Sequence, residues 1–415
     1  MRDFGRSDDP RVQAQLDRLG ALSLATGRVD LSTITALLGR LGNPQERLPP
    51  TFHVAGTNGK GSVCAFLRAM LEAEGYRVHV TTSPHLVRYN ERIRVAGKLI
   101  SDERLAEVLD EIFSAAEGLS PSFFEVTIAA AFLEFSRVPA DACVVEVGLG
   151  GRLDATNVLK PDVLAACGIA ALGIDHERFL LAPEEGTPDD PMARIAFEKS
   201  GIAKAGVPLV TLGAMLPPIC REQVRECAER AGSKLVELEQ VEVPKVLGLK
   251  GEHQSANAAL AMAMLGAQDI LQVSAEAMNA GLKRTNWPAR LQRLSNGRLV
   301  GKREVWLDGG HNRSAGDALA AHFAGKELHL IIGMLEAKDP AALLEPLSAS
   351  IRSITAVAID GYDCHPASVY GPDARPAESV EEALRNIPSD DCPILIAGSL
   401  YLAGEVLKAN DEVPD

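Results

Sequence analysis

The chain lacks any long apolar run. None of the runs in its 415 residues approaches the roughly 20 consecutive apolar residues that a membrane-spanning helix needs. The N-terminus also lacks the basic and then apolar pattern of a secretory signal, because Asp3, Asp8 and Asp9 stand among its first residues. We therefore expect a cytoplasmic protein that has no membrane as a partner.

Paired cysteine motifs are absent as well. The seven cysteines are scattered and odd in number, and several, such as Cys143 and Cys167, lie in apolar stretches. Neither a Cys-x-x-Cys pair nor a spaced Cys/His set is present, so we do not expect a structural zinc site. The pattern is typical of reduced core thiols in the cytoplasm.

Positive charge is in deficit. Lys and Arg number 42 against 56 Asp and Glu, which gives a net charge of −14 at pH 7. Proteins that bind nucleic acid present basic faces, so nucleic acid is not an expected partner. Internal repeats and low-complexity tracts are also missing, and residues 183–191 form a polar, Pro-rich segment that is typical of an exposed loop.

Apolar residues in alternating patterns are abundant. With 415 residues, of which 46% are hydrophobic, the chain exceeds the size at which one core keeps growing, so two domains are expected. Apolar runs typical of parallel strands alternate with amphipathic segments typical of helices. This alternation predicts the α/β class with mostly parallel sheets. We expect a first domain over residues 1–284, a linker over 285–297 and a smaller second domain over 298–415.

The pattern can be divided into individual elements. It predicts strands over residues 51–54, 77–82, 142–147, 163–169, 209–212, 305–308, 328–332, 354–359 and 394–397. It predicts helices from the turn near residue 60 to Gly75 and over residues 101–118, 127–135, 256–265, 341–347 and 380–384. Open parallel sheets bind ligands at the carboxyl ends of their strands, so polar residues after these strands are candidate site residues.

The most informative segment runs from Thr51 to Ser62. An apolar strand leads into the turn Gly-Thr-Asn-Gly-Lys-Gly-Ser, which then opens a helix. Such a turn directs backbone N–H groups and a helix N-terminus at one point, and Lys60 can reach the outer phosphates of a nucleoside triphosphate. The spacing departs from the usual G-x-x-x-x-G-K-[ST], and the alternative is a turn whose glycines serve only its shape.

Reactive residues fall at the ends of the next strands. Ser83 follows the second strand, Glu146 lies at the end of the third, and Asp175 and His176 come shortly after the fourth. An acidic residue in an apolar strand is costly to bury unless it is paired or binds a cation. Mg²⁺ prefers carboxylates together with phosphate oxygens and waters, so Glu146 beside the Lys60 turn predicts a magnesium site.

Each of these residues has a structural alternative. Glu146 could form an internal ion pair with Arg152 or Lys199. Ser83 could be a plain turn residue before a proline, and His176 could be a capping or surface imidazole.

In the second domain, the sequence Asp-Gly-Gly-His-Asn from Asp308 closes a strand and starts a helix. An Asp at a strand end can hold a ribose hydroxyl, and a helix start can meet phosphate. Arg290 lies at the domain junction, where an Arg could reach phosphates. The alternatives are a helix N-cap for this turn and an interdomain ion pair for Arg290.

Eight motifs then occur in order along the chain. They are Gly-Thr-Asn-Gly-Lys-Gly-Ser (56–62), Thr-Ser-Pro-His-Leu-Val-Arg-Tyr-Asn-Glu-Arg-Ile (82–93), Glu-Val-Gly-Leu-Gly-Gly-Arg-Leu-Asp-Ala-Thr-Asn (146–157), Glu-Lys-Ser-Gly-Ile (198–202), Gly-Glu-His-Gln (251–254) with Asn257, Trp-Pro-Ala-Arg (287–290), Asp-Gly-Gly-His-Asn (308–312) and Gly-Ser-Leu-Tyr-Leu-Ala-Gly (398–404). Together they resemble the folylpolyglutamate synthase/dihydrofolate synthase family of the Mur ligase superfamily, from about residue 28 to residue 404.

The resemblance implies a P-loop, Mur-ligase-type ATPase domain followed by a smaller Rossmann-like domain. It implies an ATP-dependent amide ligase, with Mg²⁺ at two sites, that adds L-glutamate to dihydropteroate and also to reduced folate. ATP converts the acid into an acyl phosphate, which the amino group of L-glutamate attacks. The positioned charge of the turn, the lysine and the metal suits phosphoryl transfer. A monomer is implied.

The same resemblance assigns roles to residues. The ATP-binding positions would be Thr57, Asn58, Gly59, Lys60, Gly61, Ser62, Asn257, Arg290, Asp308 and His311. The metal ligands would be Ser83, Glu146 and His176, and the catalytic residues Lys60, His176 and Lys199, the last at a position that is often a carbamylated lysine. The pterin-binding positions would be Arg28, Val29, Asp30, Leu31, Ser122, Phe123, Phe124, Glu125, Leu153, Asp154 and Ala155. Core aromatics are the alternative for the two phenylalanines.

The chain departs from the family pattern at several points. Between His176 and Lys199 it is longer than usual, and the common Leu-Gly-Asp-Thr sequence is missing there. Smaller departures are Gly310 for Ala, Ser200 for Ala, Ala289 for Gly, and Ser314 after Arg313 where Pro is frequent.

Two other functions are alternatives for such a sequence. A Mur-type ligase for cell-wall precursors usually has an extra N-terminal domain, and a phosphate turn that begins near residue 56 leaves little room for one. A nucleotide-switched binding protein would not need a second nucleotide-contacting domain. The set Arg290, Asp308 and His311 favours such a second domain, and therefore argues against a switch protein.

Overall fold

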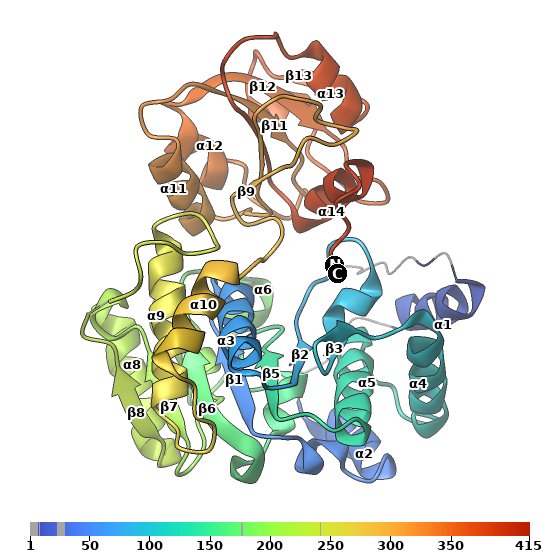
Figure 1. Cartoon of the computed structure of the whole chain (residues 1–415), viewed down its shortest axis with the longest axis vertical. Coiled ribbons are helices and arrows are strands. Elements are labelled where there is room, and N and C mark those ends of the chain that lie inside the picture. The colour runs from blue at the N-terminus through green and yellow to red at the C-terminus, as the bar shows by residue number, and fades with distance from the viewer. Residues whose placement is uncertain (1–6, 8, 23–29, 176, 241) are drawn as a thin grey trace. The chain divides into compact units, whose positions relative to one another are not determined.

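The computed structural model describes residues 7, 9–22, 30–175, 177–240 and 242–415 (Figure 1). The chain divides into two compact units, Met1–Gly248 with Ser255–Thr285 and Leu249–Gln254 with Asn286–Asp415. Each unit contains one sheet covered by helices. The α/β class predicted from the alternating pattern is confirmed.

The described part of the first unit has an eight-stranded sheet in the order β4-β3-β2-β5-β1-β6-β7-β8. Its strands are β1 (Thr51–Ala55), β2 (Val78–Thr81), β3 (Ile93–Val95), β4 (Lys98–Leu99), β5 (Ala142–Glu146), β6 (Leu164–Ile169), β7 (Pro208–Thr211) and β8 (Lys234–Glu237). Neighbours from β2 to β8 run parallel, and β3 pairs antiparallel with β2 and β4. The central strands β5, β1 and β6 are completely buried, which explains their continuous apolar sequences.

Helices flank this sheet. They are α1 (Pro10–Gly20), α2 (Ser32–Arg40), α3 (Lys60–Glu74), α4 (Asp102–Ala115), α5 (Phe123–Arg137), α6 (Glu177–Leu180), α7 (Pro191–Ser200), α8 (Pro218–Ala231), α9 (His253–Gly266) and α10 (Ala275–Arg284). Their ends follow local signals in the sequence. Ser101 caps α4 by accepting the N–H of Arg104, and Gly75 ends α3 at φ +103°, in the left-handed region that glycine favours.

The second unit repeats the same design on a smaller scale. Its described residues form a sheet in the order β13-β12-β11-β14-β10-β9. The elements are β9 (Gln292–Arg293), β10 (Val305–Leu307), α11 (Arg313–His322), β11 (Leu328–Ile332), α12 (Ala341–Leu347), β12 (Ile351–Val357), β13 (Arg375–Ala377), α13 (Val380–Asn386), β14 (Ile394–Ala397) and α14 (Leu400–Ala409). Its core contains Leu330, Ile332 and Leu395 from the central strands and Phe323 from the end of α11.

Several elements differ from the sequence expectations. The strands β8 and β13 and the helices α1, α2, α7, α8, α10 and α14 are not among the predicted elements. The hairpin of β3 and β4 and the short β9 carry no long apolar run, so periodicity missed them; β9 pairs with β10 inside the segment expected to be a linker. The strand expected over 354–359 is β12, which begins at Ile351 because Ile351 pairs with Leu328 of β11.

Among the described residues, none of the helices has the length and apolar character that spanning a bilayer requires.

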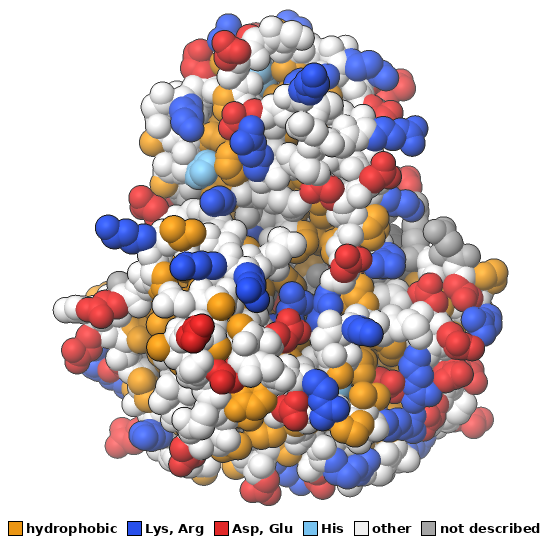
Figure 2. Space-filling view, viewed as in Figure 1, with side chains coloured by type: hydrophobic (Ala, Val, Ile, Leu, Met, Phe, Trp, Pro, Cys, Tyr) orange, Lys and Arg blue, Asp and Glu red, His pale blue; other side chains and the backbone are white. Residues whose placement is uncertain are grey.

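Charged side chains of both signs are interspersed over the face drawn in Figure 2. Apolar side chains on that face occur mostly in small groups. This distribution is the one expected from a sequence with 24% charged residues and a moderate acidic excess.

Candidate active site

The strand β1 leads directly into the glycine-rich turn and helix α3, as the sequence predicts. Gly59 caps α3 at φ +86°, and a Cβ atom there would lie 2.2 Å from Oδ1 of Asn257 on α9. Only glycine fits this position without strain. Because α3 begins at Lys60, the N–H groups of its first turn have no carbonyl one turn earlier to bind. The turn therefore has the donors of an anion site.

Contacts around the turn hold its shape. The N–H groups of Thr57 and Asn58 both donate to the carbonyl of Ala171, at 2.8 and 3.2 Å. The Nζ of Lys60 donates to the carbonyls of Gly56 at 3.1 Å and Thr57 at 3.4 Å. The ammonium group thus lies over its own turn.

Glu146 ends β5 beside this turn. The parallel register pairs it with Val54 of β1, just before the turn begins. Its Oε2 accepts the N–H of Ser83 at 3.1 Å, so two of the predicted metal ligands lie together. The residue is only 5% exposed. A buried carboxylate next to a serine is a suitable ligand set for a hard divalent cation.

Lys199 lies near the end of α7, is buried, and is close enough to Lys60 for the charge of Lys60 to act on it. Burial lowers the pKa of Lys199 to about 7, the charge of Lys60 lowers it too, and the carboxylates of Asp175, Asp154 and Glu198 oppose the shift. A lysine with this pKa is largely a neutral amine at slightly alkaline pH, and the neutral amine is the reactive form.

Asp154 lies between Leu153 and Ala155 at the start of the 3₁₀-helix η3 (Ala155–Val158). Its Oδ1 accepts the N–H and the O–H of Thr156, at 3.0 and 2.5 Å, and its Oδ2 accepts the N–H of Leu149 at 2.8 Å. Burial raises the pKa of Asp154, and these hydrogen bonds oppose the rise. The carboxylate accepts three hydrogen bonds from its own loop and has little freedom to move.

Ser122 and Glu125 form a capping box at the start of α5. Ser122 Oγ accepts the N–H of Glu125 at 3.3 Å, and Glu125 Oε2 accepts the N–H of Ser122 at 2.7 Å. Between them, Phe123 and Phe124 are partly exposed. The ring of Phe124 covers Gly148, where a Cβ atom would come within 2.4 Å of it. The aromatic pair therefore lies beside the loop that leads to Asp154.

In the second unit, Asp308 follows β10. Its Oδ1 accepts the N–H of Gly310 at 2.7 Å, and its Oδ2 accepts the N–H of Leu291 at 2.8 Å. His311 comes next, with Nδ1 3.3 Å from the carbonyl of Gly309. Asn312 then caps α11. The carboxylate closes a tight turn at the carboxyl end of the strand, where the sequence places it.

Arg290 lies beside this turn. Its Nη1 donates to the carbonyl of Ala289 at 3.2 Å, and the N–H of Gly309 donates to the same carbonyl at 2.9 Å. Ala289 has φ +57°, the left-handed conformation that suits the glycine usual in the family. His253 belongs to the same environment: burial lowers its pKa, and the charges of Asp308 and Arg290 oppose each other there.

Three predicted residues, Arg28, Val29 and His176, lie outside the described residues. Next to the first two, Oδ1 of Asp30 accepts the N–H of Ser32 at 2.7 Å, and Leu31 precedes α2.

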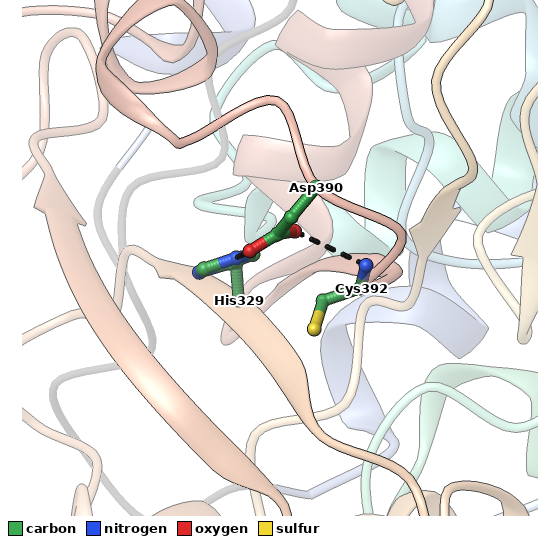
Figure 3. A group of neighbouring side chains, drawn as sticks. All are labelled: His329, Asp390 and Cys392. Atoms are coloured by element: carbon green, nitrogen blue, oxygen red, sulfur yellow. Dashed lines mark hydrogen bonds and ion pairs between the residues drawn. The ribbon is translucent and has the colours of Figure 1, made fainter.

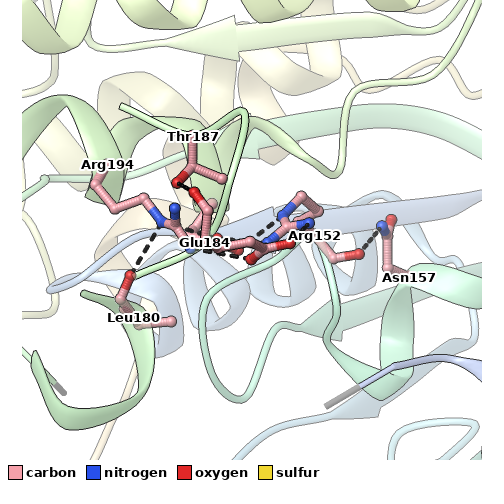
Figure 4. A network of polar contacts seen from close by, with 7 residues as sticks. Arg152, Asn157, Leu180, Glu184, Thr187 and Arg194 are labelled. Atoms are coloured by element: carbon pink, nitrogen blue, oxygen red, sulfur yellow. Dashed lines mark hydrogen bonds and ion pairs between the residues drawn. The ribbon is translucent and has the colours of Figure 1, made fainter. Parts of the chain in front are cut away.

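Arg152 forms part of an ion-pair network that periodicity could not predict (Figure 4). Its guanidinium binds Glu184 at 2.6 Å and Glu198 at 2.9 Å, and Arg194 binds the same two carboxylates at 3.1 and 3.2 Å. The segment expected to be an exposed loop is thus anchored through Glu184, and its last residue, Pro191, starts α7. A cavity of about 760 Å³ adjoins this network.

A second polar cluster lies in the second unit. Among the described residues, ligand atoms of His329, Asp390 and Cys392 lie within 4.8 Å of one another (Figure 3). The guanidinium of Arg352 lies 3.4 Å from Sγ of Cys392 and 3.9 Å from Oδ2 of Asp390. Because an arginine already supplies the positive charge, the cluster is an ion-pair network that ties the turn before β14 to β11 and β12.

No family model matches the chain. Curated proteins match it over nearly its whole length. A dihydrofolate synthetase of Saccharomyces cerevisiae is 31% identical over 92% of this chain and 97% of its own length. A dihydrofolate synthase/folylpolyglutamate synthase of Bacillus subtilis is 31% identical over 91% and 94%. The chain belongs to the dihydrofolate synthase/folylpolyglutamate synthase family. The resemblance carried by the ordered motifs is confirmed, and the protein is an ATP-dependent ligase.

Solved structures of the family have the same fold. Escherichia coli FolC in complex with DHPP and ADP superimposes with a TM-score of 0.83 at 27% identity, covering 97% of this chain and 98% of its own. Mycobacterium tuberculosis folylpolyglutamate synthase complexed with ADP has a TM-score of 0.85 at 27% identity, covering 98% and 99%. A bifunctional family member with Mn, AMPPNP and L-glutamate bound has a TM-score of 0.82 at 27% identity, with coverage of 98% and 99%.

Several residues of this site have no role that the sequence pattern predicts. His253 lies in a motif that was recognised, Arg194 stands four residues before Glu198, and Thr156 lies two residues after Asp154. His53 stands within an apolar strand, where no neighbouring residue indicates a role for it. The spacing of Arg194 and Glu198 was a usable signal for an ion pair, whereas the environment of His53 depends on residues about a hundred positions away.

Proposed function

We propose that this ligase adds L-glutamate to dihydropteroate and also to reduced folate. Supporting observations are the helix N-terminus at Lys60, the Ser83–Glu146 pair at the neighbouring strand ends, and the buried Lys199 in the same unit. The pairing of Glu146 with Val54, directly before the glycine-rich turn, is the single observation that carries the proposal. It gives a phosphate donor set and a cation ligand at one edge of the sheet.

The residues present suit ATP and Mg²⁺. Residues Thr57 to Ser62 would receive the phosphates, with the N–H groups of the first turn of α3 and the ammonium of Lys60 as donors. Ser83 and Glu146 would hold one divalent cation, and His176 would join Glu146 at a second. When bound, the cation neutralises phosphate charge and favours phosphoryl transfer to the acid. The ammonium of Lys60 would exchange its hydrogen bonds to the carbonyls of Gly56 and Thr57 for hydrogen bonds to the phosphates. It would then stabilise the negative charge that develops on them during transfer.

Lys199 would act as a carbamate. Carbamylation needs a neutral amine, and the lowered pKa of about 7 makes that form abundant at physiological pH. The modification would replace a positive charge beside Lys60 with a negative one. A group that repels Lys60 would thereby become one that attracts both Lys60 and a cation.

The acid substrate would bind in the first unit. Leu153, Asp154 and Ala155, residues 122–125, and residues 28–31 would form its pocket. The faces of Phe123 and Phe124 would stack on a pterin ring, and the carboxylate of Asp154 would accept its N–H groups. Asn257, Arg290, Asp308 and His311 would contact the nucleoside and phosphates of ATP.

We also propose that the protein acts as a cytoplasmic monomer and does not bind nucleic acid. All seven cysteines are described, and none of them forms a disulfide, which suits a reducing compartment. The acidic excess over the whole sequence disfavours a polyanion as a partner.

A turnover assay tests the proposed function. The protein is given ATP, Mg²⁺ and L-glutamate, with dihydropteroate and tetrahydrofolate offered in separate reactions. We expect phosphate release that requires both glutamate and the pterin acid. Release that is independent of either substrate, or release only with a uridine-nucleotide muramic acid, would refute the assignment in favour of a simple ATPase or a cell-wall ligase.

A further inference from the structure

His53 is one of the buried histidines that have no role in the proposed reaction. His53 lies in the middle of β1, is fully buried, and pairs with Val145 and Cys167 on the neighbouring strands. Its Nε2 lies 2.8 Å from Oγ1 of Thr156. Thr156 in turn donates its hydroxyl proton to Oδ1 of Asp154 at 2.5 Å. A continuous hydrogen-bonded line therefore joins the central strand to the carboxylate that we assign to pterin recognition.

The number of protons available decides which group donates and which accepts in each of these two hydrogen bonds. A threonine hydroxyl has one proton, and here that proton is given to Asp154. Thr156 Oγ1 must then accept from His53, so Nε2 of His53 carries its proton and Nδ1 is bare. The surroundings agree, because Nδ1 is buried and has no hydrogen-bond partner. A bare ring nitrogen in that place is less costly than an N–H group would be.

His53 also stays neutral. Burial lowers its pKa to about 3, and the nearby ammonium of Lys204 acts in the same direction. A neutral imidazole with one fixed proton is a permanent donor at every physiological pH. His53 therefore always donates to Thr156, so that Thr156 donates to Asp154, and His53 takes no part in proton transfer.

From this arrangement we infer that His53, through Thr156, is a positioning residue that keeps Asp154 a hydrogen-bond acceptor and so selects acids whose ring presents N–H donors. The inference rests on the proposed function of Asp154. The Oδ1 atom is used by the N–H and O–H of Thr156, while Oδ2 receives the N–H of Leu149 and retains acceptor capacity. If the line were broken, the carboxylate could rotate or take up a proton and offer a donor instead.

Two variants of Thr156 test the inference, the first isosteric with threonine and the second without its methyl group. Thr156→Val removes the hydroxyl, and Thr156→Ser keeps it. We expect Thr156→Val to raise the KM for dihydropteroate by about tenfold or more, as loss of a hydrogen bond to a charged group would. The KM values for ATP and L-glutamate should stay within about twofold of the wild type, and Thr156→Ser should restore the dihydropteroate KM. Equal losses in both variants, or a parallel rise in the KM for ATP, would overturn the inference.

A second pair of variants acts on the histidine. His53→Gln retains an N–H donor, and His53→Leu does not. We expect the glutamine variant to keep a lower dihydropteroate KM than the leucine variant, and the reverse order or no difference counts against the inference. Because His53 is completely buried, thermal unfolding of each variant is measured first, and the Thr156 pair decides the matter if a His53 variant does not fold.

A measurement without turnover separates this inference from the proposed function. The ¹⁵N spectrum of histidine-labelled wild-type protein should show His53 with a protonated Nε2 and a bare Nδ1 from about pH 5 to pH 8. The opposite tautomer, or titration in that range, overturns the inference even if the enzyme uses dihydropteroate. Conversely, failure of the wild type to use dihydropteroate overturns the proposed function and leaves the tautomer result standing.

Discussion

Two lysines, Lys60 and Lys199, influence each other in the first unit. The positive charge of Lys60 is the largest cause, after burial, of the lowered pKa of Lys199. Their roles differ because their surroundings differ. Lys60 is partly exposed and bonds to the carbonyls of its own turn, whereas Lys199 is buried among carboxylates.

Replacing Lys60 should abolish catalysis and leave the fold intact. We expect Lys60→Ala to lower kcat by about 10²–10³-fold, because a positioned donor to the developing phosphate charge is lost. Its thermal unfolding should match the wild type, since the ammonium bonds to two carbonyls of its own partly exposed turn. The exposed Lys326 provides the control, and Lys326→Ala should keep full activity. Near-normal glutamate ligation by Lys60→Ala would contradict this role.

Replacing Lys199 should lower activity, and an added carboxylic acid should restore part of that activity. We expect Lys199→Ala to lose about 10²-fold or more in kcat, and to recover part of it when a small carboxylic acid replaces the missing carbamate. Lys204→Ala is the control, because Lys204 is a half-buried lysine whose pKa burial also lowers but which bonds to the carbonyl of Asn157. The same acid should not rescue it. Full activity of Lys199→Ala without any acid would rule out the carbamate.

The titration of Lys199 should also be visible in stability. Its pKa is 10.5 for an ordinary lysine and about 7 in the fold, so between these values the unfolded chain binds the extra proton. The free energy of unfolding must then rise as pH increases from 7 towards 10, by up to about 1.4 kcal/mol per pH unit from this group. We expect Lys199→Met to be more stable than the wild type at pH 7 in CO₂-free buffer.

That difference between Lys199→Met and the wild type should shrink towards pH 10. Denaturant titrations at pH 7, 8, 9 and 10 measure it, and the comparison cancels the other groups that titrate in this range. A difference that does not change with pH would mean that Lys199 has an ordinary pKa in the fold.

At the scale of elements, the start of α3 depends on one glycine. Gly59→Ala places a Cβ at φ +86° and within 2.2 Å of Asn257 Oδ1. We expect it to lower the free energy of unfolding by about 1–3 kcal/mol and to weaken ADP binding, because the turn must shift. Denaturant titration and calorimetry of ADP binding measure the two effects.

Gly39 provides the matched control for that prediction. It lies inside α2, and nothing lies within 4 Å of the position that its Cβ would take. Gly39→Ala should therefore raise the free energy of unfolding by about 0.5–1 kcal/mol and leave ADP binding unchanged. Equal behaviour of the two variants would show that the backbone conformation at Gly59 is not what matters.

Most elements could be predicted because their signals are local. The glycine-rich turn, Gly75 after α3, Ser101 before α4 and the apolar runs of β5 and β6 all follow from neighbouring residues. The strands β3 and β9 could not be predicted, because their short sequences form strands only through pairing with β2 and β10. The same holds for the start of β12.

At the scale of the first unit, the network of Arg152, Glu184, Arg194 and Glu198 joins three separate segments (Figure 4). The side chains of Arg194 and Glu198 are each only 6% exposed. Removing one partner would leave a charge that is buried and uncompensated. The network therefore holds the longer segment before α7 against the loop that contains Arg152.

A substitution in this network should be costly for folding. We expect Arg194→Ala to lower the free energy of unfolding by roughly 3 kcal/mol or more, measured by denaturant titration. Arg313→Ala is the control, because the pair of Arg313 and Glu345 is largely exposed and should contribute little. If both variants unfold at the same denaturant concentration as the wild type, the network does not anchor this segment.

Local patterns alone were enough to establish the α/β class, the glycine-rich turn with Lys60, and the ordered motifs that identify the family. These features depend on residues that are neighbours in the sequence, so composition and spacing carry them. Only the folded chain could bring Glu146 beside that turn, lower the pKa of Lys199 to about 7, and join His53 through Thr156 to Asp154. Burial and long-range pairing cause these effects, and both arise when distant segments pack together.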